Sequence, residues 1–263
     1  MDYLRLLKDT IRPENVADVI VNPIKQVKQH AKLSNTYKFV STERLISEIE
    51  SFGLKHNAEN DNSIKPRDKD RIGYTKHLLD FSTGYKVRDN ELKLLVTNSH
   101  DGTSSVQFNI GIFRFACANG LIVGDSLYKE RFIHNNNQVE KMREALKQLP
   151  ERLEIVANTI NKMQSIEVSQ SDKYLLCNKL CELRGFKGKV NFMDLLQPLR
   201  NADLNNDLYT IYNIVQEKME RGGYLEYFPA KKRKVRAIKS INTKLKLNKE
   251  LFDFAYNLTR EVA

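Results

Sequence analysis

The densest chemical feature of the sequence is a basic segment, residues 229–249. It contains nine Lys and Arg residues and no Asp or Glu, namely Lys231, Lys232, Arg233, Lys234, Arg236, Lys239, Lys244, Lys246 and Lys249. The formal net charge of the chain is +10, so this segment accounts for most of it. A high density of cations attracts phosphates and releases their counterions, which favours salt-dependent, sequence-independent binding of nucleic acid.

Aromatic residues come directly before the basic segment. Tyr224, Tyr227 and Phe228 lie within five residues of one another, and aromatic rings in such a position can stack on unpaired bases. We therefore expect an interface whose stacking residues are Tyr227 and Phe228 and whose phosphate-binding residues are Lys231, Lys232, Arg233, Lys234, Arg236 and Lys239. The alternative is a solvated basic loop, which is the commoner meaning of a single charge run.

A second group of polar residues lies in the middle of the chain. NSHDG (98–102), RFACANG (114–120) and RFIHNNN (131–137) fall at the ends of predicted strands. Packing alone explains five of their side chains less readily than the rest: His100, Arg114, Asn119, Arg131 and His134. We add Arg114 and Arg131 to the candidate nucleic-acid-binding residues.

A metal site built from His100, Asp101, Cys117 and His134 is the competing interpretation of this group. Zinc needs three or four converging ligands, and the spacing here contains neither CxxC nor HExxH. A turn accounts for Asp101, and Cys117 is typical of a small core residue. The sequence predicts no metal and no cofactor.

Signatures of catalysis are missing from the sequence. It has no Walker loop, no GxGxxG after a strand and no dense carboxylate cluster. Nothing presents a nucleophile beside a base. We expect a binding protein rather than an enzyme, and a metal-dependent nuclease that uses His100, Asp101 and His134 is the weakest alternative.

Composition sets the class of protein. The chain has 263 residues, 41% of them hydrophobic and 29% charged, which is typical of a globular protein. No window approaches the apolar run of about 18 residues that a membrane helix needs, and the N-terminus lacks the features of a secretory signal. Three cysteines in a long chain favour a reducing compartment, so we expect the cytoplasm of a host cell and no membrane partner.

The elements that must position these residues change in type along the chain. Residues 1–35 predict a polar helical arm, and 37–40 (YKFV) predict a short strand. Ser41 or Thr42 is expected to cap a helix that ends at Gly53.

Sheet periodicity dominates the next part. Strands are predicted at 73–81, 91–98 and 104–118, and the last has four alternating apolar residues that should face the core: Val106, Phe108, Ile110 and Ile112. Asp101 and Gly102 predict a hairpin turn, because both accept the left-handed backbone at low cost.

From about residue 137 the apolar period is that of helices. Helices are predicted for 171–185, 208–223 and 250–263, after a long one that Pro150 should break or kink. Residues 228–250 look less regular. The fold class is therefore α+β, with an antiparallel sheet and hairpins in the N-terminal half and helices in the C-terminal half. We divide the chain into an arm (1–35), a sheet with a long helix (36–165) and a helical region (166–263).

Four stretches of the sequence resemble a known protein family. They are YKFVSTERLISEIESFG, LLVTNSHDGTSSVQFNIGIFRFACANGLIVG, ERFIHNNNQVEKM and VRAIKSINTKLKLNKELFDFAYNL. Together they are similar to the phage- and plasmid-borne family called domain of unknown function, family 932. The similarity extends from about residue 36 to 260, and it implies an origin in a phage or other mobile element.

Two functions remain open besides the nuclease. The first is binding of nucleic acid, with single-stranded DNA favoured, for annealing in replication or recombination; homo-oligomers often extend such sites. The second is an interaction protein that binds a host protein and antagonises a host defence system. The acid-free basic segment favours the first.

Overall fold

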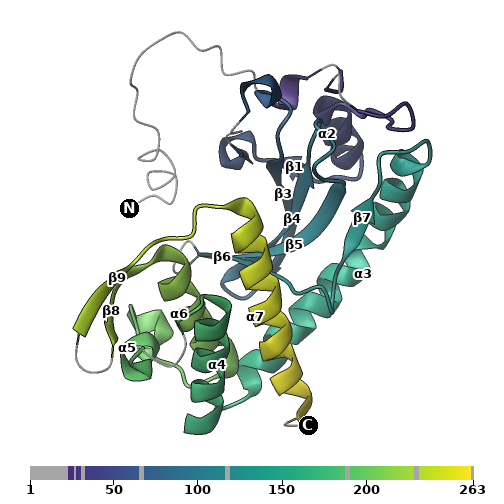
Figure 1. Cartoon of the computed structure of the whole chain (residues 1–263). Coiled ribbons are helices and arrows are strands. Elements are labelled where there is room, and N and C mark those ends of the chain that lie inside the picture. Colours follow the sequence, from purple (N-terminus) through teal and green to yellow (C-terminus); the bar gives the residue numbers. More distant parts are fainter. Residues whose placement is uncertain are drawn as a thin grey trace. The chain divides into compact units, whose positions relative to one another are not determined.

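A computed structural model describes residues 23–26, 28–30, 33–64, 68–115, 119–186, 190–227 and 231–261. In chain order the elements are η1 (Pro23–Lys25), α2 (Thr42–Glu50), β1 (Lys55–His56), η2 (Ala58–Asn60), β2 (Asn62–Ser63), η3 (Lys69–Arg71), β3 (His77–Val87), β4 (Asn90–Asn98), β5 (Val106–Arg114), β6 (Asn119–Ile122), β7 (Glu130–Phe132), α3 (Gln138–Ser165), α4 (Gln170–Leu183), α5 (Phe192–Leu196), η4 (Asn201–Asp203), α6 (Leu208–Arg221), β8 (Gly223–Tyr227), β9 (Lys231–Val235) and α7 (Ile241–Glu261). The fold class is α+β, as predicted (Figure 1).

The chain forms two compact units. The first contains the described residues up to Gly120 together with Lys129–Leu153, and the second contains Leu121–Tyr128 and the described residues from Glu154 onwards. The sequence placed its divisions elsewhere, at residues 35 and 165. Each unit is described below by itself.

A seven-stranded antiparallel sheet forms the centre of the described part of the N-terminal half. Its strand order is β1-β3-β4-β5-β6, with β2 beside β3 and β7 beside β5. The register pairs Leu94 with Ile110 and Val96 with Phe108, so one face of the sheet is continuously apolar. These four side chains are fully buried or almost so, as the alternation in the sequence predicted for β5.

The ends of the first helix and of the central hairpin follow the sequence signals. Ser41 caps α2, its hydroxyl accepting a hydrogen bond from Arg44 N at 3.2 Å. The turn between β4 and β5 contains Asp101 and Gly102, and Gly102 has a φ of +74°. Both predictions are confirmed.

Other predictions for this half need correction. Residues 37–40 form no strand, because the segment makes an isolated backbone hydrogen bond, Lys38 N to His134 O at 3.1 Å, in place of a ladder. The strand predicted at 73–81 begins later and runs longer, as β3. Most of the predicted arm, residues 1–35, lies outside the described residues, and Pro23–Lys25 there form a 3₁₀ turn.

The second unit is built from helices and one hairpin. Helix α3, of which Gln138–Leu153 belong to the first unit and the rest to the second, is continuous through Pro150, so Pro150 does not break it. The predicted irregular stretch 228–250 is also wrong. Its described part, from Lys231 onwards, contains strand β9 and the first half of α7, and β9 pairs with β8 in an antiparallel hairpin. Figure 1 shows this hairpin extending from the helices α4, α5 and α6.

Gly222 sets the close approach between α6 and the hairpin. It has a φ of +70°, and a Cβ there would lie 2.4 Å from the carbonyl oxygen of Val235. Gly185 also follows a helix at a positive φ, of +73°, but a Cβ there would meet nothing within 4 Å. Gly222 also has a ψ of −163°, in a backbone region that essentially only glycine adopts. A side chain at Gly222 would therefore meet strain and collision, whereas a side chain at Gly185 would meet strain alone.

We expect Gly222→Ala to lower the free energy of unfolding by about 3 kcal/mol or more, because it combines strain with a clash against backbone. Gly185→Ala should cost about 1 kcal/mol, from strain alone. Urea titrations of the two variants measure the difference. Equal losses would show that the hairpin does not pack against Gly222 as described.

Candidate nucleic-acid interface

The basic hairpin, β8 with β9, is anchored to its own unit at the edge of β8. Asn191 N donates to Glu226 O at 2.8 Å, and Glu226 N donates to a carboxylate oxygen of Asp194 at 3.0 Å. Leu225 and Val235 are buried beneath the strands. These contacts fix β8, so β9 is the outer strand of the hairpin. Among the described residues no strand pairs with the other edge of β9.

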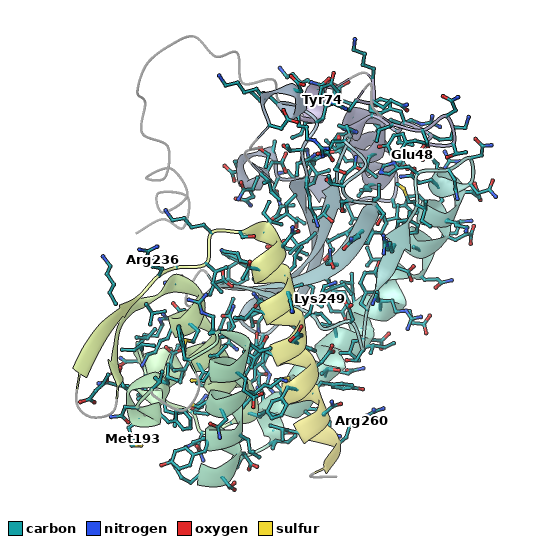
Figure 2. All side chains as sticks on the ribbon, in the orientation of Figure 1. Glu48, Tyr74, Met193, Arg236, Lys249 and Arg260 are labelled. Carbon is teal, nitrogen blue, oxygen red and sulfur yellow. The ribbon has the colours of Figure 1, made fainter. Side chains whose placement is uncertain are left out.

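Three of the predicted cations project from this scaffold into solvent. Lys234, Arg236 and Lys239 are exposed, and Figure 2 labels Arg236 on the chain just beyond β9. For Tyr227, Lys231, Lys232 and Arg233 the structure places the backbone within the hairpin, and their side chains lie outside the described set. Phe228 lies outside the described residues altogether.

Two lysines of the basic segment are half-buried and paired with carboxylates. Lys244 Nζ lies 2.6 Å from a carboxylate oxygen of Glu220, and Lys249 Nζ lies 2.6 Å from one of Asp125. An ammonium group already bound to a carboxylate in a half-buried position is a poor partner for a phosphate. The charges available for binding are therefore fewer than the sequence count implies.

Arg184 is a contributor that the sequence interpretation missed. Its Nη2 donates to the carbonyl oxygen of Arg236 at 2.8 Å, and its guanidinium lies 5.4 Å from the centre of the Phe186 ring. It therefore lies beside the end of β9. The signal was present in the sequence, because residues 184–189 (RGFKGK) form a second short basic run without an acid.

Arg114 and Arg131 belong to the first unit, whereas the other candidates belong to the second. Arg114 is buried, and its Nε donates to Asp89 at 3.1 Å. Its charge is therefore paired with a carboxylate at the end of β5. Arg131 is exposed and its Nε donates to the hydroxyl of Ser105 at 2.7 Å. Only Arg131 presents its side chain to solvent.

The NSHDG group forms a buried hydrogen-bond chain in the first unit. The Thr42 hydroxyl lies 2.8 Å from Nε2 of His77 and 2.9 Å from Nε2 of His100. His77 Nδ1 lies 3.1 Å from the Thr75 carbonyl, which can only accept, so Nδ1 carries the proton. Nε2 of His77 then accepts from the Thr42 hydroxyl, which in turn accepts from His100.

Burial favours the neutral form of two histidine rings in this region, His77 and His134. Burial lowers the pKa of His77 to about 4, because an imidazolium loses hydration in the interior. Burial also lowers the pKa of His134, whose ring stacks on Tyr37 at 4.5 Å between centroids. Asp101 accepts hydrogen bonds from the backbone and hydroxyl of Thr103, which is the turn role expected for it.

The described residues provide neither a metal site nor a reactive thiol. Across the described ranges, no three His, Cys, Asp or Glu side chains come together as metal ligands. Cys117 and the side chain of Asn119 lie outside the described set. Burial raises the pKa of Cys177 to about 12 and of Cys181 to about 11, so both thiols are protonated and unreactive at neutral pH. None of the described helices is long and apolar enough to span a bilayer.

Comparison with known proteins assigns the family. The chain belongs to the family described as Domain of unknown function (DUF932), which matches residues 29–252, in agreement with the resemblance in the sequence. The UPF0380 proteins YfjQ and YafZ of Escherichia coli (strain K12) are each 28% identical to it over 239 residues. The alignments cover 89% of this chain and 86% of each relative. No solved structure gives a significant match.

The buried histidine chain predicts a loss of stability in acid. Because the pKa of His77 is lower in the folded state than the ordinary 6.5, the unfolded state binds the proton first as the pH falls. The free energy that neutral His77 contributes to folding is intact above pH 6.5. It is lost as the pH falls towards 4, a total of about 3 kcal/mol. In this window the free energy of unfolding should fall by up to about 1.4 kcal/mol per pH unit because of His77, and we expect His77→Gln to remove that dependence. Urea titrations at stepped pH measure it, and an unchanged slope would contradict the assignment.

Proposed function

We propose that this protein binds nucleic acid through the basic hairpin of its second unit. The carrying observation is that three exposed cations, Lys234, Arg236 and Lys239, lie at the end of β9 and in the connection from β9 to α7. Hydrogen bonds from Arg184 to Arg236 O and from Ile238 N to Glu220 O hold the backbone of that connection. Cations on a rigid element lose little conformational freedom when they meet a phosphate.

Contacts of this kind bind the sugar–phosphate backbone and leave base edges free. That is the requirement of a protein that holds single strands for annealing, and we infer a role in the replication or recombination of a mobile element. Single-stranded DNA is the favoured ligand, with assembly of several copies along the strand. The cytoplasm of a host cell is the place of action in this proposal, because mobile elements are copied there.

Charge reversal at the hairpin tests the proposal. We expect Lys234→Glu, Arg236→Glu and Lys239→Glu together to weaken binding to a labelled single strand roughly tenfold or more, because about three phosphate contacts are lost. The slope of log K against log salt should fall by about 2. Fluorescence anisotropy in a salt series measures both quantities.

The matched control reverses three exposed lysines of α3, Lys141, Lys147 and Lys162, whose neighbours include acids. It has the same net charge as the hairpin variant. If the two triple variants bind equally well, the interaction depends on overall charge and the hairpin is not the site.

A further inference from the structure

The sheet of the first unit has a second face with a different character from its apolar one. Alternation along β5 places Asn109, Gly111 and Phe113 opposite the buried Phe108 and Ile110. Phe115 continues this row, because its N–H donates to Asp89 O at 2.9 Å and extends the ladder past the end of the strand. We call Phe113 and Phe115 the aromatic platform.

The two rings of the platform contact each other edge to face. Their centroids are 5.6 Å apart and their planes are inclined by 86°. Phe115 is 51% exposed and Phe113 is half-buried. The pair therefore leaves one aromatic ring open to solvent and a second ring beside it, an arrangement on which a flat ring can stack.

Lysines lie over both rings. Lys93 Nζ is 5.0 Å from the centre of the Phe113 ring and is held there by Asp80, whose two oxygens are each 3.1 Å away. Lys86 Nζ is 6.0 Å from the centre of the Phe115 ring. Lys86 is exposed and makes no ion pair within the described residues. The carboxylate opposite it in the ladder, Glu91, accepts a hydrogen bond from the Ser82 hydroxyl, so the Lys86 charge is available to a ligand.

The open part of this face is confined to the platform end of β5. Farther along the strand Asn109 is buried, and so is Thr97, which pairs with Gln107 near the opposite end of β5. A ligand on this face would therefore contact the platform and the residues around it.

We propose that the aromatic platform stacks unpaired bases of a single strand, with Lys86 meeting the adjoining phosphate. Each nucleotide carries a flat ring and a negative charge, which matches an exposed ring with an unpaired ammonium beside it. Open sheet faces with aromatic residues bind single strands in this way. The inference rests on the proposed function and assigns the preference for single strands to the first unit.

Tryptophan fluorescence tests this directly, because the chain contains no Trp. In Phe115→Trp, oligothymidylate should cause a saturable loss of emission, and an abasic strand of equal length should bind without that loss. The control is Ile133→Trp, 67% exposed and just beyond β7. Because β7 pairs with the opposite end of β5, this probe lies roughly 25 Å from the platform and should keep its emission.

An affinity measurement accompanies the fluorescence. Phe115→Ala should weaken single-strand binding by about 5- to 100-fold, the effect of one stacked base, and leave duplex binding unchanged. If a labelled strand binds but the emission of the Phe115→Trp protein stays constant, the platform proposal is overturned and the proposed function stands. If no strand or duplex binds to the wild type at low salt, both fail.

Discussion

The buried carboxylate of Glu220 is the interaction on which the arrangement of the second unit depends. One oxygen accepts from Lys244 Nζ at 2.6 Å, and the other accepts from Gln216 at 2.8 Å and Asn248 at 3.0 Å. Its backbone carbonyl accepts from Ile238 N at 2.9 Å, directly beyond β9. A buried charge is tolerated only when it is paired and fully hydrogen-bonded. This residue therefore joins α6 to α7 and fixes the chain on both sides of the hairpin.

The Glu220 network also explains how the basic segment is used. Lys244 neutralises a carboxylate that the fold needs, and Lys249 does the same for Asp125. The exposed cations lie at the end of the hairpin and just after it, with Lys234 on β9 and Arg236 and Lys239 in the connection to α7. An excess of charge in the sequence is thus divided between ions that hold helices together and ions that face solvent. Only the second group can release counterions from a bound strand.

The sequence predicted local features well and long-range ones poorly. The alternation in β5, the cap at Ser41 and the turn at Gly102 depend on neighbouring residues, and the structure has them. Strand β9 gave no signal, because its sequence is KKRKV and its partner supplies the buried Leu225. The ion pair of Arg114 was not predicted, because its partner Asp89 lies 25 positions away. The aromatic platform needs the register of β5 and the ladder to Asp89, which no pattern in the sequence reveals.

The central claim is that cations of the hairpin bind nucleic-acid backbones. The most direct measurement is the affinity of the wild-type protein for a labelled single strand across a salt series. The account predicts tight binding at low salt and a linear fall of log K with log salt, with a slope of about −0.7 for each phosphate contacted. It also predicts weaker binding to a duplex of equal length. No binding at low salt, or an affinity that does not change with salt, would contradict the account.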